Sequence, residues 1–248
     1  EGWVVVVHGE RIAAAGPAGS IAVPDEARVV ALPDSTLLPG LIDAHTHVLL
    51  HPYDEAKWDD QVLREPLALR ICRATNHLRA ILESGFTTIR DLGTEGAGYA
   101  DVGLRDAVAQ GIVPGPRMLV ATRAIVATRT YAPAGVAPEL TIPQGAEEAD
   151  GEALVRVVRD QVGRGADVIK IYADQDRGPT FTHDEWERIV RTAHTLGRPV
   201  AAHATTRDGM LRALTAGADT IEHGYGGDRQ VIAMMASQHV GFCPTLTA

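Results

Sequence analysis

The chain has 248 residues, of which 45% are hydrophobic and 22% charged, with a formal net charge of −9 and two cysteines. The apolar fraction excludes a disordered chain, and so few cysteines exclude a disulfide-built scaffold. No apolar run approaches the roughly 20 residues of a membrane helix, and no basic patch indicates nucleic acid. We therefore expect a globular protein without a membrane or nucleic-acid partner.

Residues 1–36 are predicted to form a small β meander of a separate domain. Residues 3–16 have the pattern of two strands around a Gly-Glu turn, and residues 27–32 that of a third strand. Three strands alone have little stability, so we expect them to pack on a partner sheet. Because residue 1 is not Met and the chain ends directly after a strand-like run, we also expect a piece of a longer protein.

Residues 37–248 are predicted to form an α/β domain in which strands and helices alternate. The predicted strands are 41–44, 86–90, 117–121, 167–172, 199–203, 220–223 and 240–246. The predicted helices are 65–83, 104–109, 152–162, 182–196, 209–216 and 231–237. The strands are apolar throughout, as is typical of strands buried on both faces. Thr182 and Glu185 have the spacing of a capping box, and residues 124–150 are predicted to be a long loop.

This alternation predicts a (β/α)8 TIM-type barrel with about seven strands present and the last unit missing. Three helix-to-strand connections have closely similar sequences, which supports a repeated unit: residues 84–88, 165–168 and 217–220. A doubly wound open sheet is the alternative. It would require a Gly-rich phosphate loop after an early strand, and the sequence has none.

Four histidines and one lysine fall in or directly after predicted barrel strands. His45 and His47 are two residues apart on an extended segment, so both side chains face the same side. Lys170 lies within an apolar strand, and His203 and His223 end the next two strands. Barrel active sites form at the carboxyl ends of strands, where converging imidazoles suit a divalent transition metal. A single His or H-x-H pair can equally be structural, but a buried Lys needs a partner or a shifted pKa, and together they predict a metal site.

The run from Leu38 to His47 (LPGLIDAHTH) resembles the opening motif of the amidohydrolase superfamily. Lys170, His203 and His223 match the ligands that this superfamily carries on its fourth, fifth and sixth strands. The resemblance covers nearly the whole chain, and it implies that residues 1–36 form part of the small β-sandwich domain of the superfamily. It implies that Lys170 is carboxylated by CO2 and bridges two divalent metal ions, with Zn expected and Mn or Co as alternatives.

In the binuclear pattern that the resemblance implies, His45 and His47 bind one metal ion and His203 and His223 bind the other. A bridging hydroxide then attacks the substrate. The aspartate of the superfamily, a ligand and general base after the eighth strand, has no counterpart in this sequence. We therefore expect the chain as given to be inactive or nearly so.

Residues 142–151, 168–174 and 221–224 look like the prolidase-like and Xaa-dipeptidase branch, which is loosely grouped as imidazolonepropionase-like. This implies a metal-dependent hydrolase of an amide bond next to a free carboxylate, in Xaa-Pro or other dipeptides or in N-acyl amino acids. The substrate candidates are Arg129, Tyr131 and Tyr225, since a guanidinium binds a carboxylate bidentately. Arg129 and Tyr131 can equally serve to hold the long loop.

Two other functions stay open. The same metal site can hydrolyse a lactone, carbamate or phosphotriester, or the chain can be a catalytically dead amidohydrolase-like scaffold. Every ligand position within the chain carries its expected residue, which favours the enzyme. We expect a small-molecule or dipeptide substrate and a homo-oligomer. Two cysteines suit either redox compartment, with the cytoplasm slightly favoured.

Overall fold

The computed structural model describes residues 2–137, 139–175 and 178–246. The chain divides into two compact units, Glu1–Pro39 and Gly40–Ala248. In the part of the chain that is described, no helix combines the length and the apolar character needed to cross a membrane.

The first unit contains a β-hairpin and an extended segment. Its elements are β1 (Trp3–His8), β2 (Arg11–Pro17) and the short 3-10 helix η1 (Ala18–Ser20). β1 and β2 pair antiparallel around Gly9, which has a φ of +60°. The third strand predicted over residues 27–32 is wrong, because these residues form no strand. Val29 and Val30 are 78% and 64% exposed, and the segment has no neighbouring strand in this unit to supply ladder hydrogen bonds.

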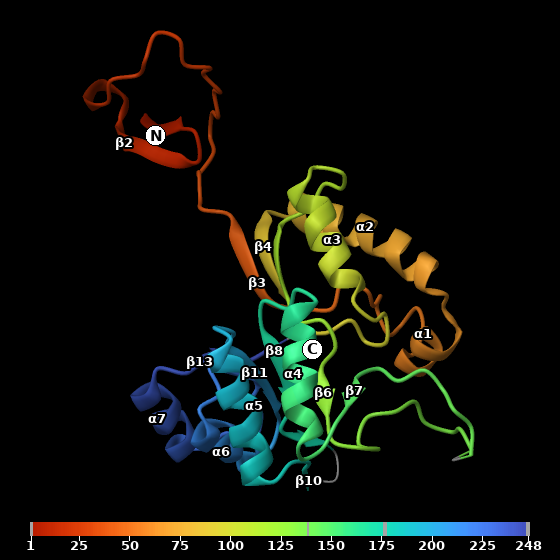
Figure 1. The fold of residues 1–248 in the computed structure, drawn as a ribbon. Helices are drawn as coiled ribbons and strands as arrows, with labels where there is room; N and C mark the ends of the chain where they lie inside the picture. Colours follow the sequence, from red (N-terminus) through yellow and green to blue (C-terminus); the bar gives the residue numbers. More distant parts are fainter. Residues whose placement is uncertain (1, 138, 176–177, 247–248) are drawn as a thin grey trace. The chain divides into compact units, whose positions relative to one another are not determined.

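The second unit is an α/β fold in which helices and parallel strands alternate along the chain (Figure 1). Its main strands are β3 (Leu41–Thr46), β4 (Phe86–Asp91), β5 (Arg117–Val120), β8 (Ile169–Tyr172), β11 (Val200–Ala204), β12 (Thr220–His223) and β13 (Gly241–Cys243). Its helices are α1 (Trp58–Arg64), α2 (Leu67–Glu83), α3 (Ala100–Ala109), α4 (Ala153–Gly163), α5 (His183–Thr195), α6 (Arg207–Ala216) and α7 (Arg229–Gln238). Four two-residue strands complete the unit: β6 (Ile125–Val126), β7 (Glu147–Glu148), β9 (Asp174–Gln175) and β10 (Gly178–Pro179).

The main strands lie side by side in chain order. One parallel sheet has the order β3-β4-β5, and the other has the order β13-β12-β11-β8-β6-β7. Backbone N–H groups of Asp167 and Val168 donate to the carbonyl of Val120 at 2.8 and 3.4 Å, which places the start of β8 beside β5. The α/β class with parallel strands is therefore confirmed, and the strand order is the one expected for a (β/α) barrel.

The long loop predicted over residues 124–150 contains β6 and β7, which the sequence did not indicate. Both extend the second sheet in parallel, with Ile125 paired to Glu147 on one side and to Ile171 on the other. Two-residue strands are too short to show a hydrophobic period, so this error follows from their length.

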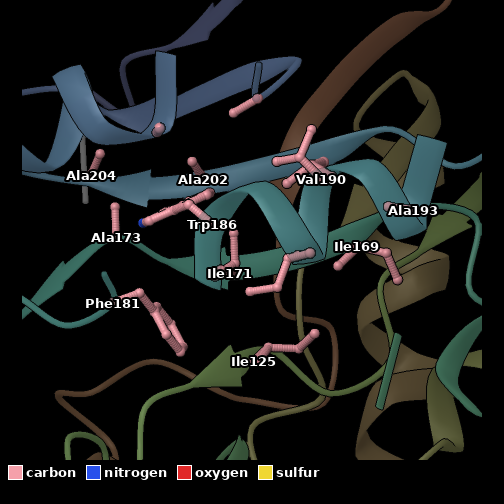
Figure 2. Close-up of a cluster of buried hydrophobic side chains, with 14 of the residues drawn as sticks. Ile125, Ile169, Ile171, Ala173, Phe181, Trp186, Val190, Ala193, Ala202 and Ala204 are labelled. Carbon is pink, nitrogen blue, oxygen red and sulfur yellow. The ribbon is translucent and has the colours of Figure 1, made fainter. Parts of the chain in front are cut away.

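The largest core cluster lies between the second sheet and helices α4, α5 and α6. Figure 2 shows Trp186 of α5 in this cluster with Ile171 of β8 and Ala202 of β11, and all three side chains are fully buried. The predicted capping box begins α5, with Thr182 accepting from the backbone N–H of Glu185 and Glu185 accepting from that of Thr182. This packing holds β8, β11 and β12 as a rigid platform for the residues at their carboxyl ends.

Gly209 in α6 packs against the buried carboxylate of Asp174, and a Cβ there would overlap it. That carboxylate accepts from the backbone N–H and the hydroxyl groups of Thr205 and Thr206, so it has no room to move. We expect Gly209→Ala to lower the free energy of unfolding by about 1–3 kcal/mol. At Gly103 in α3, a Cβ would meet no atom of the described residues within 4 Å, so Gly103→Ala should raise stability by about 0.5–1 kcal/mol. Urea unfolding of both variants measures these changes. Equal losses of unfolding free energy in the two variants would contradict the expectation.

Candidate metal centre

The four predicted histidines converge at the carboxyl ends of three parallel strands. His45 lies near the end of β3, and His47 directly follows this strand. His203 lies in β11, and His223 ends β12. The ring centroid of His45 is 5.3 Å from that of His47 and 4.9 Å from that of His223. The rings of His203 and His223 are 4.5 Å apart. Residues separated by up to 178 positions in the sequence thus form one imidazole cluster.

Lys170 of β8 lies beneath this cluster. Its side chain is 0% exposed, and its Nζ has no hydrogen-bond partner among the described residues. Burial lowers the pKa of Lys170 to about 8, because a low-dielectric surrounding disfavours the ammonium. A larger share of the amine is then uncharged, which is the form that reacts with CO2.

Burial also keeps the imidazoles neutral. It lowers the pKa of His45 to about 3, that of His203 to about 2 and that of His223 to about 4. A neutral imidazole has a lone pair free for a metal ion, whereas an imidazolium does not. At neutral pH these side chains are therefore in the protonation state that metal binding requires.

Hydrogen bonds to the second ring nitrogen orient two of the histidines. Nδ1 of His47 lies 2.9 Å from the carbonyl oxygen of Gly93, and Nδ1 of His223 lies 2.7 Å from Oγ1 of Thr245. In both rings this leaves Nε2 for another partner. Metal-binding histidines commonly have one nitrogen fixed in this way.

His45 is oriented by Glu222, a residue for which the sequence suggested no role. Nδ1 of His45 lies 2.9 Å from Oε2 of Glu222, while Oε1 accepts from Arg90 Nη2 at 2.6 Å and from Thr220 Oγ1 at 2.7 Å. Burial raises the pKa of Glu222, but the His45 hydrogen bond and the charges of Lys170 and Arg90 outweigh it and lower the pKa to about 2. Glu222 is thus an ionised carboxylate that holds His45.

The thiol of Cys243 lies behind the same histidine. One potential ligand atom from each of His45, Glu222 and Cys243 lies within 4.8 Å of the other two. Glu222 already has a partner on each oxygen, and burial raises the pKa of Cys243. We therefore assign Glu222 and Cys243 to the support of His45.

Two further carboxylates hold backbone around the cluster. Asp91, fully buried at the end of β4, accepts from the N–H groups of Val48 at 2.8 Å and Gly93 at 3.2 Å. Burial raises the pKa of Asp91 well above its usual range. Asp174 binds the segment after β11, and its Oδ1 lies 4.0 Å from Nε2 of His203. Both residues connect neighbouring strand ends, which fits a structural role.

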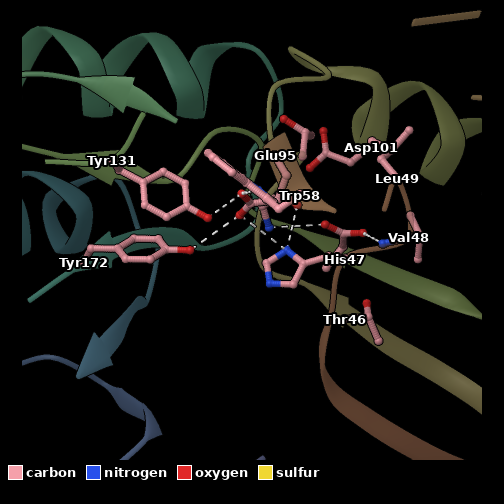
Figure 3. Close-up of polar contacts among 12 residues, drawn as sticks. Thr46, His47, Val48, Leu49, Trp58, Glu95, Asp101, Tyr131 and Tyr172 are labelled. Carbon is pink, nitrogen blue, oxygen red and sulfur yellow. Dashed lines mark hydrogen bonds and ion pairs between the residues drawn. The ribbon is translucent and has the colours of Figure 1, made fainter. Parts of the chain in front are cut away.

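The three predicted substrate residues lie in different surroundings. The Tyr131 hydroxyl donates to Oε2 of Glu95 at 2.7 Å, so it is already engaged (Figure 3). Tyr225 is 60% exposed, with its ring centroid 5.7 Å from that of His223. Arg129 is exposed, and its backbone N–H donates to Oε1 of Glu148 at 3.0 Å. The sequence also did not indicate Glu95, which follows β4 and lies beside His47.

Residues 36–241 of the chain match the family described as the amidohydrolase family. The chain belongs to this family. It is 28% identical to ochratoxinase of Aspergillus niger over 240 residues, covering 84% of this chain and 47% of that protein. It is also 28% identical to an uncharacterized protein of Mycobacterium tuberculosis over 223 residues, covering 85% of this chain and 50% of that protein.

Solved structures agree with this assignment. A prolidase complexed with N-methylphosphonate-L-proline superposes with a TM-score of 0.87 and 30% identity, covering 98% of this chain and 61% of that one. A Xaa-Pro dipeptidase with bound methionine gives a TM-score of 0.82 and 29% identity, covering 98% of this chain and 62% of that one. The amidohydrolase superfamily expected from the motifs is therefore confirmed, with prolidases among its structural neighbours. The chain spans about half the length of the curated relatives it matches.

Proposed function

We propose that this amidohydrolase is a metal-dependent hydrolase of an amide bond next to a free carboxylate, as in Xaa-Pro or other dipeptides and N-acyl amino acids. The observation that carries the proposal is the cluster of histidines above the buried, unpaired Nζ of Lys170. Similarity to a prolidase, a Xaa-Pro dipeptidase and ochratoxinase supports hydrolase chemistry and suggests this substrate class.

His45 and His47 would hold one divalent cation, and His203 and His223 would hold a second. Neutral imidazoles favour Zn, with Mn or Co as alternatives. Such cations, when bound, acidify water and polarise the scissile carbonyl. The buried Lys170 would carry the CO2-derived carbamate between them.

The carbamate suits the position of Lys170 for an electrostatic reason. The neutral amine would form a bond from Nζ to the carbon of CO2 and release one proton. Counted from the ammonium, two protons leave in all, and a cationic side chain becomes an anionic one. An ammonium repels dications strongly at short range in a buried site, whereas a carbamate attracts them. The lowered pKa of Lys170 favours this reaction because burial enriches the neutral amine.

Recognition of the substrate carboxylate requires a donor near the histidines. Tyr225 is the first of the remaining candidates, because its ring lies 5.7 Å from that of His223. Its hydroxyl lies 3.0 Å from Oγ1 of Thr245. Arg129, in the loop after β6, is the second. Tyr131 is less suited to this role because its hydroxyl already donates to Glu95.

A substrate screen on the full-length protein tests the substrate class. We expect hydrolysis of Xaa-Pro dipeptides, other dipeptides or N-acetyl amino acids, and loss of that activity after treatment with a metal chelator. The matched control for each active dipeptide is its C-terminal amide, which lacks the carboxylate and should be hydrolysed at least about tenfold more slowly. Turnover of lactones or phosphotriesters while every free-carboxylate amide fails would contradict the proposal.

A further inference from the structure

Glu95 is a buried carboxylate beside the histidine cluster. It lies in the loop after β4, is 2% exposed, and has a φ of +49°. This left-handed conformation is uncommon for a residue with a Cβ and persists where the surrounding structure imposes it, often at functional sites. The position of Glu95 is therefore strongly constrained by its neighbours.

The two oxygens of Glu95 have different surroundings. Oε2 accepts from Trp58 Nε1 at 2.9 Å and from the Tyr131 hydroxyl at 2.7 Å. Oε1 lies 3.5 Å from the Tyr172 hydroxyl and 3.8 Å from Nδ1 of His47. Figure 3 shows these side chains directed at the carboxylate from several parts of the chain. Oε1, the less occupied oxygen, is the one that faces the histidines.

No lysine or arginine pairs with this carboxylate among the residues that the structure describes. The guanidinium of Arg70 instead donates to the backbone carbonyls of Leu49, Thr94 and Glu95. Glu222, in contrast, has Arg90 at 2.6 Å. A buried carboxylate that contacts no cation is unfavourable. The charges of Arg70 and Lys170 act on Glu95 without an ion-pair contact, so a further positive charge beside it would be favourable.

Gly93 supplies the backbone turn between His47 and Glu95. Its φ of +149° is one that side chains rarely adopt, while a Cβ there would make only ordinary van der Waals contact with Oε1 of Glu95 at 3.4 Å and Cε1 of His47 at 3.6 Å. The carbonyl of Gly93 also binds Nδ1 of His47. Local backbone geometry thus holds this carboxylate against a predicted metal ligand.

A series of aromatic rings connects Glu95 with the other side of the cluster. The ring centroids of Trp58 and Tyr131 are 4.9 Å apart, as are those of Tyr131 and Tyr172. Tyr172 then stacks on His203 at 4.4 Å with an interplanar angle of 17°. Glu95 therefore lies beside His47, and its neighbour Tyr172 stacks on His203.

We propose that Glu95 is a positioning residue of the metal centre, whose carboxylate supplies the negative charge that offsets the cations bound at His47 and His203. Its hydrogen bonds to Trp58 and Tyr131 would also fix the rings that support His203. This inference rests on the proposed function, since it requires a bound divalent cation.

Zinc titration of the full-length protein, stripped of metal and measured against a competing chelator, tests this role. We expect Glu95→Gln to weaken Zn²⁺ binding by about 10–100-fold. The thermal midpoint of the metal-free variant should equal or exceed that of the wild type, because Gln keeps the shape and removes an unpaired buried charge. Tyr131→Phe is the matched control: it removes one hydrogen bond and keeps the charge, so it should weaken zinc binding less.

If Glu95→Gln bound zinc with the affinity of the wild type, the inference would be overturned, whether or not the thermal midpoint changed. If Glu95→Gln lowered the thermal midpoint of the metal-free protein as much as Glu222→Gln does, Glu95 would be a residue that stabilises the fold. That result would also overturn the inference. If the wild type binds none of Zn, Mn and Co, the proposed function fails first and this role fails with it. If the wild type and Glu95→Gln bind zinc equally, only the role of Glu95 fails.

Discussion

Lys170→Ala is expected to abolish most of the hydrolytic activity of the full-length protein. The substitution removes the amine that would carry the anionic carbamate between two cations. We expect kcat/KM to fall by more than about 100-fold, beyond the loss typical of a residue that only supports a ligand. Short carboxylic acids such as acetate should restore part of the activity, because they can supply an anionic bridge in the space vacated by the buried side chain.

Lys57 provides the matched control for this substitution. It is the other lysine of the chain, and it is exposed before α1. Lys57→Ala should leave the activity unchanged. The carbonyl signal of a carbamate formed from 13C-labelled bicarbonate should persist in Lys57→Ala and be lost in Lys170→Ala. Unchanged activity in Lys170→Ala would contradict the role assigned to this residue.

Glu222→Gln is expected to weaken metal binding and also to destabilise the metal-free protein. A neutral amide holds His45 less strongly, so zinc affinity should fall by about 10–100-fold. Arg90 would lose the carboxylate that it contacts at 2.6 Å, and removal of one partner from a buried pair costs about 3 kcal/mol. Zinc titration and urea unfolding of the metal-free protein measure the two effects separately.

The control for Glu222→Gln is the same change at an exposed histidine partner. Glu187 lies 3.2 Å from His183 on the surface of α5, and both side chains are about half exposed. Glu187→Gln should alter stability by no more than about 0.5 kcal/mol and should leave zinc affinity unchanged. If Glu222→Gln changed stability and zinc affinity as little as Glu187→Gln, the carboxylate of Glu222 would not be what holds His45 in place.

The parts of the fold that depend on long, regular patterns were predictable from the sequence. Seven apolar runs, each after the first preceded by a helical run, correspond to the seven main strands, because a strand buried on both faces must be apolar along its length. Because His45, His203 and His223 fall at predicted strand ends, their convergence could also be predicted. Parallel strands in one sheet direct their carboxyl ends to the same side, which accounts for His203 and His223 on β11 and β12. His45 lies on β3 of the other sheet, so its approach also depended on the barrel arrangement that the alternation predicted.

Features that depend on tertiary contacts were not predictable in this way. Val29 and Val30 lie in a run with strand propensity, yet a strand needs a neighbour, and propensity does not report one. Glu95 carries no local signal except its position between Gly93 and Gly96, because its partners come from distant segments. Glu222 carries the same kind of signal as Lys170, because it is a charged residue within an apolar strand. Its role was therefore predictable from the sequence on the same grounds.

The four histidines and Lys170 are proposed to hold divalent metal ions for hydrolysis. Metal analysis of the full-length protein, purified without chelators, tests this proposal most directly. We expect about two equivalents of Zn, or of Mn or Co, per chain, falling to near zero in Lys170→Ala. Fewer than about one equivalent in the wild type would contradict a binuclear metallohydrolase.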